Sequence, residues 1–267
     1  MSAVVFVGGG RITSAMLAGL RLANVKERFV VHDRNPDKLR DLKKHYRVAV
    51  EPDLRRAVTG ASMLIIAVRP DSVLELLRSI GKVKSSMLAV SLAAGLPLRV
   101  LRTALGRPIR WARAMPSPVC RSGCGLTAVT FPGKLSRQDR KRVSDFFLNV
   151  GQVVELPESK FDAFTVTYSS SHGYHALATL TKAAQEIGLD RKTALLASAH
   201  ALADGIVAWR DGQHSLQSLQ SLLKEAATPG GIAATTMAGM EQAGYGRAVR
   251  KGVRDGLRRA AFWGGPS

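Results

Sequence analysis

Three consecutive glycines near the N-terminus carry the clearest chemical signal in the sequence. An apolar run typical of a β-strand precedes them, and apolar residues with helical spacing follow them. Gly8 permits a sharp turn and Gly10 allows close approach of a pyrophosphate, while the helix that begins at Arg11 and Ile12 directs free N–H groups towards its charge. An ordinary flexible turn after a strand is the alternative, but the strand–turn–helix context favours a dinucleotide-binding turn. Thr13 stands where a smaller residue is usual, so we expect slightly looser packing of this helix on the strand.

An acidic residue follows the second expected strand. Asp33 lies about 20 residues beyond the glycines, where a carboxylate accepts a hydrogen bond from an adenosine ribose hydroxyl. Its neighbour Arg34 could instead bind the 2′-phosphate of NADP, so NADH and NADPH both stay open. The same stretch also fits a turn and helix cap with Pro36 at the first helical position, and the two interpretations are compatible.

Composition describes a globular chain of one or two domains. The chain has 267 residues, of which 46% are hydrophobic. No apolar run approaches the roughly 20 residues that a bilayer span needs. The first residues lack the charged segment of a signal peptide, so we expect none. Cys120 and Cys124 are the two cysteines, and without a second pair we expect free thiols in a cytoplasmic protein and no metal site.

The net charge of +19 is the one unusual feature of the composition. Binding to nucleic acid or to a membrane surface would explain it. However, the basic residues are spread along the chain and no nucleic-acid module is present, so we expect neither partner. A generally basic proteome is the simpler explanation, and an anionic cofactor and substrate would also favour a positive field.

Strands and helices alternate through the first half of the chain. This alternation predicts an α/β fold with a doubly wound sheet and right-handed crossovers over residues 1–157. The apolar run 63–68 ends at Arg69 and Pro70, at the carboxyl end of a buried strand, where ligands gather in such sheets. We expect strands at residues 4–7, 29–33, 47–50, 63–68, 87–91, 109–115, 125–131 and 151–156.

No convincing strand follows Phe161. Apolar residues at helical spacing predict helices over residues 161–187, 191–209, 216–226, 232–242 and 245–262. The chain therefore ends in an all-helical domain, residues 158–267. This domain is small for so many apolar faces, so we expect a homodimer that buries them between subunits.

Five short motifs occur along the chain. They are VFVGGG at residues 5–10, AVRP at 67–70, SLAAG at 91–95, RAMP at 113–116 and TPGG at 228–231. In this order and spacing the chain resembles Δ1-pyrroline-5-carboxylate reductases over nearly its whole length. That family has Ala-Val-Lys-Pro at the second motif and Ser-Pro-Gly-Gly at the last.

The resemblance implies a Rossmann-type domain followed by a helical domain that builds an intertwined dimer, in some members assembled further. It implies NAD(P)H-dependent reduction of a cyclic imine, the last step of proline biosynthesis. The cofactor is then NADPH or NADH. The residues expected to bind it are Gly8, Gly10, Arg11, Ile12, Asp33, Arg34, Ala67, Val68, Arg69, Pro70, Ala93, Ala94, Gly95, Met115 and Pro116.

The chain departs from the family at residues that would face the substrate. Ser117 follows the fourth motif where the family has an asparagine that orders the nicotinamide site. His172 replaces the proline of a helix-breaking Gly-Pro pair. Ala233 stands where the family has a threonine whose hydroxyl approaches the imine. Thr235 and Thr236 come two and three positions too late to point the same way on a helix.

If the substrate is a cyclic imino acid, the helix start at Gly230 and Gly231 is the expected seat for its carboxylate. His172 is the expected proton donor or carboxylate partner, because an imidazole exists in both protonation states near neutral pH. A histidine that caps the helix or packs at the dimer interface is the alternative. Hydroxyl groups would add donors, with Thr228 assigned a catalytic role; they belong to Thr228, Ser169, Ser170 and Ser171.

Three functions remain open on these observations. The first is a pyrroline-5-carboxylate reductase with a remodelled site, and the second is a related reductase of another imine or carbonyl. The third is a nucleotide-binding protein that has lost catalysis. The intact glycine turn and Pro-Gly-Gly motif favour an enzyme over the third.

Overall fold

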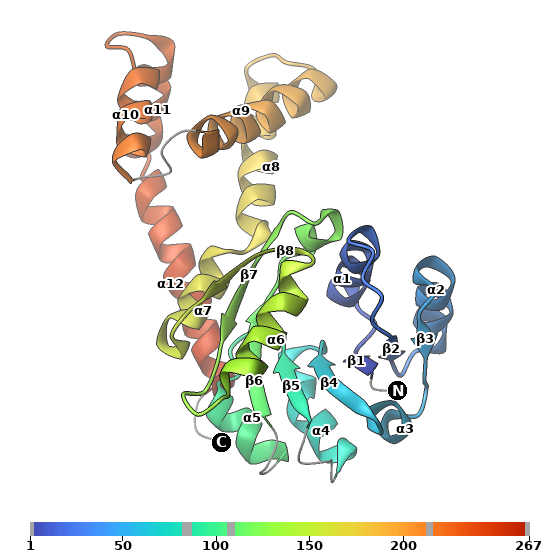
Figure 1. Ribbon diagram of the computed structural model, residues 1–267. Coiled ribbons are helices and arrows are strands. Elements are labelled where there is room, and N and C mark those ends of the chain that lie inside the picture. The colour runs from blue at the N-terminus through green and yellow to red at the C-terminus, as the bar shows by residue number, and fades with distance from the viewer. Residues whose placement is uncertain (1–2, 82–86, 106–109, 212–215, 265–267) are drawn as a thin grey trace. The chain divides into compact units, whose positions relative to one another are not determined.

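The structure, a computed structural model, describes residues 3–81, 87–105, 110–211 and 216–264 (Figure 1). Internal contacts divide the chain into two compact units. Unit 1 comprises Met1–Tyr168 and Asp255–Ser267, and unit 2 comprises Ser169–Arg254. The predicted boundary between residues 157 and 158 lies at the start of α7 (Glu158–Thr167), inside unit 1. That boundary remains our proposal for where the cofactor-binding and dimerisation functions divide.

Unit 1 is built on an 8-stranded sheet of order β3-β2-β1-β4-β5-β6-β7-β8 in the described part of the chain. Strands β1 to β6 pair in parallel wherever they are neighbours, and β7 pairs with β8 in parallel. The strands are β1 (Ala3–Val7), β2 (Phe29–His32), β3 (Ala49–Val50), β4 (Ala61–Ile66), β5 (Leu88–Ser91), β6 (Arg110–Met115), β7 (Gly125–Thr130) and β8 (Gly151–Glu155).

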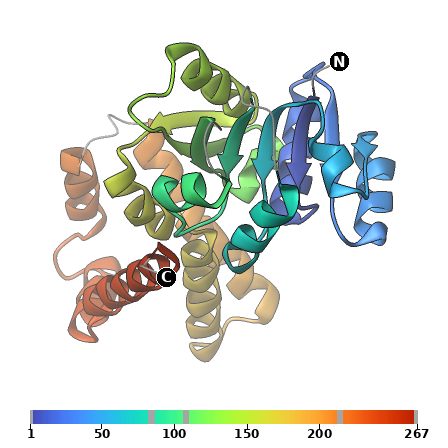
Figure 2. The same cartoon turned by 90° about the horizontal axis from the view of Figure 1, so that it is seen from below.

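Helices cover both faces of this sheet, as Figure 2 shows. Side chains alternate between the faces along a strand, so Val4 and Phe6 join one buried cluster while Val5 and Val7 join the other. This two-sided burial explains the continuous apolar runs in the sequence. The first cluster is completed by α1 (Arg11–Leu22), α2 (Pro36–Tyr46) and α6 (Arg137–Leu148), and the second by α3 (Leu54–Val58), α4 (Pro70–Ile80) and α5 (Leu98–Leu105).

One pair of strands departs from the expected crossovers, because β6 and β7 are antiparallel. Residues 116–124 connect them and contain only the short 3-10 helix η1 (Pro118–Ser122). A parallel pair needs a crossover of about a dozen residues or more. The short connection therefore returns β7 beside β6 in the opposite direction.

The helix expected over residues 161–187 is split in two. α7 ends at Thr167 and α8 (Ser170–Glu186) begins after the extended residue Ser169. The hydroxyl groups of Ser169 and Ser171 share a hydrogen bond of 2.7 Å. Ser169 caps α8 without a side-chain hydrogen bond, so the break occurs here without a Gly-Pro pair.

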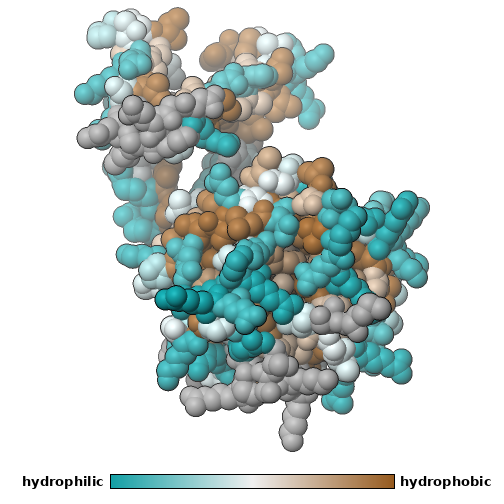
Figure 3. Space-filling model, viewed as in Figure 1, coloured by the Kyte–Doolittle hydropathy of each residue, from teal (hydrophilic) through white to brown (hydrophobic). Residues whose placement is uncertain are grey.

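Unit 2 leaves most of its apolar side chains exposed. It contains α8, α9 (Arg191–Asp211), α10 (Leu216–Ala226), α11 (Ile232–Gln242) and the first part of α12 (Tyr245–Gly264). Ala194 and Ser198 are buried there, whereas Ile187 is 85% and Ile232 is 89% exposed. Figure 3 shows apolar surface on these helices. The exposed apolar residues of the unit are Tyr174, Ile187, Leu189, Leu195, Leu196, Leu202, Ile206, Val207, Leu219, Leu223, Ile232, Met240, Tyr245 and Val249.

Candidate active site

The strand order creates a switch point at the carboxyl edge of the sheet. From β1 the chain moves outward to β2 and β3, and it then returns to β4 on the other side of β1. Ligands of open α/β sheets bind in the crevice at such a point. Because β1, β2, β4, β5 and β6 run in parallel, the residues predicted to bind the cofactor lie at this one edge. They are Gly8, Gly10, Arg11 and Ile12 after β1, Asp33 and Arg34 after β2, residues 67–70 after β4, residues 93–95 after β5, and Met115 and Pro116 at the end of β6.

Gly8 turns the chain off β1 in a conformation that favours glycine. Its φ is +108°, and a Cβ at this position would lie 2.6 Å from the carbonyl oxygen of Ala67. Backbone hydrogen bonds fix the turn: the Gly8 N–H donates to the His32 carbonyl at 2.8 Å, and the Ala67 N–H donates to the Val7 carbonyl at 2.8 Å. Glycine is therefore needed here for the shape of the protein itself.

Gly10 is different, because ordinary residues could adopt its backbone conformation. Its φ is −79°, and a Cβ added to it would meet nothing within 4 Å. Gly10 lines a cavity of about 450 Å³ together with Arg11, Lys38 and Arg121. It caps α1 without a side-chain acceptor, so the first N–H groups of the helix are left for another partner. The open space, the helix N-terminus and the three basic side chains in the lining fit a pyrophosphate.

The rest of α1 packs closely on its surroundings. The looser packing expected at Thr13 is not found, because Thr13 is fully buried and its hydroxyl donates to the Gly8 carbonyl. At Gly19 an added Cβ would overlap the carbonyl oxygen of Cys120. α1 therefore rests directly on η1, the segment that follows the predicted cofactor residues Met115 and Pro116.

Asp33 is bonded to the glycine turn. Its Oδ2 accepts the Gly9 N–H at 2.7 Å, and its Oδ1 accepts the Asn35 N–H at 2.8 Å. Asn35 supplies the side-chain cap of α2. Asp33 also lines a second cavity, of about 480 Å³, together with Gly8 and Arg34. The carboxylate thus holds the turn and faces the space beside it.

The segment after β6 contains the two cysteines. Ser117 caps η1 by accepting the Val119 N–H at 3.1 Å, so the residue that replaces the family's asparagine has a local structural role. Cys120 and Cys124 are both free, as expected. Cys120 is fully buried, and burial raises the pKa of its thiol to about 11, whereas Cys124 is exposed.

Alkylation should therefore distinguish the two thiols. In the native protein at mildly alkaline pH, iodoacetamide is expected to modify Cys124 and spare Cys120, because the thiolate is the reactive form and Cys120 stays protonated. Intact mass spectrometry should find one adduct per chain, two after unfolding, and none in native Cys124→Ser. Modification of Cys120 at the rate of Cys124 would show that η1 opens readily.

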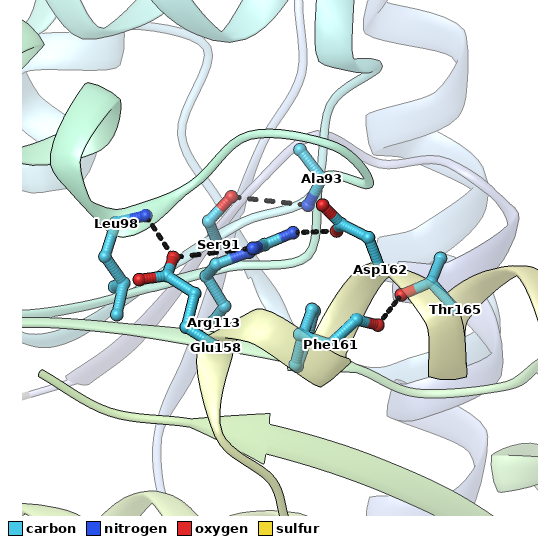
Figure 4. Close-up of polar contacts among 8 residues, drawn as sticks. All are labelled: Ser91, Ala93, Leu98, Arg113, Glu158, Phe161, Asp162 and Thr165. Carbon is cyan, nitrogen blue, oxygen red and sulfur yellow. Dashed lines mark hydrogen bonds and ion pairs between the residues drawn. The ribbon is translucent and has the colours of Figure 1, made fainter. Parts of the chain in front are cut away.

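Arg113 is a charged side chain in the middle of a buried strand. It lies on β6, and its side chain is 1% exposed. Nη2 donates to Oδ1 of Asp162 at 2.6 Å, and Nη1 donates to Oε1 of Glu158 at 3.5 Å (Figure 4). The guanidinium also lies over the Phe161 ring, 4.3 Å from its centroid. All three partners belong to α7, so this cluster ties α7 to the sheet.

The same cluster reaches the start of α5. Oε1 of Glu158 accepts the Leu98 N–H at 2.6 Å, and α5 follows the predicted cofactor segment at residues 93–95. Arg113 belongs to the fourth sequence motif, and no role was predicted for it. A single charge within the apolar stretch 111–114 was the available signal, since a charge in a buried strand needs a partner. The partners follow 45 and 49 positions later, so no local pattern identifies them.

The predicted catalytic histidine lies at the start of α8 in unit 2. The His172 N–H donates to the Ser169 carbonyl at 3.0 Å, and its side chain is exposed. Ser169 and Ser171 bond to each other as described above. The side chain of Ser170 lies outside the described residues.

The Pro-Gly-Gly motif forms the turn that starts α11. Gly230 has a φ of +75°, and Gly231 caps the helix without a side-chain hydrogen bond. The Gly231 N–H donates to the Thr228 carbonyl at 2.9 Å. The hydroxyls of Thr235 and Thr236 donate to carbonyls one turn back, so both are engaged by their own helix.

The predicted residues thus fall into two groups. Those assigned to the cofactor lie in unit 1, and those assigned to catalysis and substrate lie in unit 2. Among the described residues, no group of three or more histidine, cysteine, aspartate or glutamate side chains could hold a metal ion. Within the described ranges, no helix has both the length and the apolar character that crossing a bilayer requires.

Both halves of the chain match known protein families. Residues 3–95 match the family described as NADP oxidoreductase coenzyme F420-dependent, and residues 158–262 match the family described as pyrroline-5-carboxylate reductase dimerisation. The pyrroline-5-carboxylate reductase of Mycobacterium leprae is 31% identical over 215 residues, covering 76% of this chain and 72% of the relative. That of Mycobacterium tuberculosis is 28% identical over 287 residues, covering 97% and 96%.

Solved structures give the same fold. The pyrroline carboxylate reductase of Plasmodium falciparum with NADP bound has a TM-score of 0.88 at 22% identity, covering 99% of this chain and 98% of that one. The enzyme of Streptococcus pyogenes has a TM-score of 0.87 at 19% identity, covering 97% and 98%. The predicted Rossmann-type sheet followed by a helical dimerisation domain is confirmed. The chain belongs to the pyrroline-5-carboxylate reductase family.

Proposed function

We propose that this protein reduces Δ1-pyrroline-5-carboxylate to proline with NADPH or NADH. The observation that carries the proposal is the open space over Gly10, at the N-terminus of α1 and at the switch point of the sheet. A Cβ would project into that space, and the backbone φ of −79° is one that other residues adopt, so the backbone conformation does not require glycine here. Space for a pyrophosphate is the reason we infer.

In this proposal the residues of unit 1 hold the dinucleotide. A reduced nicotinamide supplies the hydride for the C=N bond when it is bound. The N–H groups at Gly10, Arg11 and Ile12 hold the pyrophosphate, and Asp33 and Arg34 flank the adenosine end. The loops at the other strand ends complete the cofactor set: Gly8, Ala67, Val68, Arg69, Pro70, Ala93, Ala94, Gly95, Met115 and Pro116.

The residues of unit 2 bind the substrate in the same proposal. The helix start at Gly230 and Gly231 seats the substrate carboxylate through the first N–H groups of α11, which have no acceptor within the helix. His172 donates the proton that the imine nitrogen needs once carbon has accepted hydride, so the C=N bond becomes a CH–NH bond. Hydroxyl donors assist from Thr228, Ser169, Ser170 and Ser171.

We further propose that the active form is a cytoplasmic homodimer, joined through the helices of unit 2, that serves proline biosynthesis. The exposed apolar side chains of α8 to α11 support this, because a monomer would leave them in water. The match of residues 158–262 to a dimerisation family supports it as well.

A coupled measurement tests the proposed function. Purified protein given Δ1-pyrroline-5-carboxylate should consume NADH or NADPH, followed by absorbance, and form an equal amount of proline. His172→Ala should lower turnover by at least about tenfold, and His175→Ala, on the same helix, is the control. Failure to consume either cofactor would reject the activity. Wild-type turnover in His172→Ala would leave that histidine a structural role.

A reductase of a different imine or carbonyl is the second candidate. Ala233 favours it, because it lacks the hydroxyl that the family places near the imine, and Thr235 and Thr236 do not replace it. A panel of cyclic imines and carbonyl compounds, assayed with both cofactors, separates the candidates. A substrate turned over faster than Δ1-pyrroline-5-carboxylate would select this second function.

A further inference from the structure

The cavity of about 480 Å³ beside the glycine turn is lined by more acidic than basic residues. Three acidic residues are among those that line it, namely Asp33, Asp53 and Glu75, and the carboxylate of Asp53 also accepts the Arg56 N–H at 2.8 Å. They come from separate elements, namely the end of β2, the cap of α3 and the middle of α4. Among the described residues that line it, Arg34 is the one arginine or lysine. A dianionic group placed in this cavity would therefore meet more repulsion than attraction.

The carboxylate of Asp33 cannot easily move out of the cavity wall. Each of its oxygens accepts a backbone N–H, from Gly9 at 2.7 Å and from Asn35 at 2.8 Å, and its side chain is 13% exposed. Turning away would break both bonds. Because one of these bonds is to the glycine turn, the carboxylate stays beside any nucleotide that binds there.

The nearby cations do not outweigh the negative charge of the acidic residues that line the cavity. The ammonium of Lys38 already lies 3.8 Å from Oδ2 of Asp33, and its side chain lines the other cavity. Arg34 is exposed, and its planar guanidinium can stack on an adenine ring as well as bind a phosphate. One exposed arginine is thus set against three carboxylates.

We infer that this cavity takes an adenosine with a free 2′-hydroxyl, so that the enzyme uses NADH in preference to NADPH. The hydroxyl donates to Asp33, whereas a 2′-phosphate brings a charge of about −1.5 to −2 towards the carboxylates. The inference rests on the proposed function, which by itself leaves the two cofactors equal.

Binding measurements without turnover test the inference. Isothermal titration calorimetry at one ionic strength should give NADH at least about tenfold tighter binding than NADPH. The fragments isolate the adenosine cavity: adenosine 5′-monophosphate should bind more tightly than adenosine 2′,5′-diphosphate. The ratio of KM values for the two cofactors should follow the same order.

Asp33→Asn removes the charge and keeps one of the two side-chain oxygens, so one of the two backbone N–H groups loses its acceptor. It should reduce the preference for NADH at least about fivefold. Asp37→Asn is the matched control, because Asp37 lies exposed on the first turn of α2 and is not among the lining residues. Glu75→Gln tests the same wall from an exposed helix position and should reduce the preference about threefold, even if Asp33→Asn unfolds.

Equal binding of the two cofactors, or tighter NADPH, would overturn the inference and leave the proposed function standing. A second outcome would also overturn the inference. If the preference for NADH is the same in Asp33→Asn and Glu75→Gln as in the Asp37→Asn control, the carboxylates are not its cause. Failure of both dinucleotides to bind would overturn the proposed function along with it.

Discussion

Asp162→Ala is expected to lower the free energy of unfolding by about 3 kcal/mol, although the residue lies on the first helix after the sheet and is not in the apolar core. Its carboxylate lies 2.6 Å from a guanidinium that is 1% exposed. Without it, Arg113 keeps Glu158 at 3.5 Å, and a buried charge that loses its nearest partner is strongly destabilising. Denaturant unfolding followed by tryptophan fluorescence measures the loss.

Adding Arg113→Met should recover part of that loss. Methionine fills a similar volume without a charge, and the remaining Glu158 is 36% exposed and can be hydrated. The double variant Arg113→Met/Asp162→Ala is therefore expected to be about 1–2 kcal/mol more stable than Asp162→Ala alone. Removing a second residue and gaining stability is a result that loss of packing cannot give.

The matched control is an exposed ion pair of the same length. Asp145 accepts from Lys141 at 2.6 Å on α6, and its side chain is 51% exposed. Asp145→Ala should cost about 0.5 kcal/mol or less, because exposed pairs contribute little. Equal losses in Asp162→Ala and Asp145→Ala would contradict the view that Arg113 depends on its carboxylates.

Gly8→Ala and Gly10→Ala should affect different properties, although the glycines are two positions apart: Gly8→Ala should mainly lower stability, and Gly10→Ala should mainly weaken dinucleotide binding. Gly10→Ala is expected to weaken dinucleotide binding about 30-fold, equivalent to about 2 kcal/mol of overpacking, and to lower stability by about 1 kcal/mol or less, because alanine is a poorer N-cap of α1 than glycine. The added methyl group meets no protein atom within 4 Å and occupies the space we assign to the pyrophosphate. Calorimetry with NADH, beside a thermal unfolding curve, measures both quantities.

Gly8→Ala should instead destabilise the fold by about 3 kcal/mol. Its φ of +108° is unfavourable for alanine, and the new Cβ would lie 2.6 Å from the Ala67 carbonyl oxygen. Unchanged stability in this variant would mean that the turn can rearrange. Normal NADH binding by Gly10→Ala would reject the pyrophosphate site and with it the proposed function.

Local sequence patterns were sufficient for the strands of unit 1, for the helices between them and for the glycine turn. The spacing of apolar residues in a strand or helix depends on which of its faces are buried. Both faces of this sheet are buried, so continuous apolar runs indicated β1, β4 and β5. The turn could be predicted because Gly8 and Gly10 meet two local requirements, a positive φ and an open approach. Five motifs in order were enough to indicate the family.

Three features of the structure were not predicted in this way. The antiparallel direction of β7 goes with a connection too short for a parallel crossover, and the apolar helical pattern continues through the break between α7 and α8. The burial of Arg113 was visible as a charge in an apolar strand, but its pairing with Asp162 was not.

The sequence by itself determined the succession of strands and helices along the chain, the glycine turn and the family, because each depends on neighbours in the chain or on short motifs. It left NADH and NADPH equal, since Asp33 and Arg34 are adjacent and argue in opposite directions. The tertiary structure provides the basis for a preference, by bringing Asp53 and Glu75 into the same cavity wall as Asp33. Electrostatic balance in a cavity is a sum over all the charges that line it, and only the fold decides which charges those are.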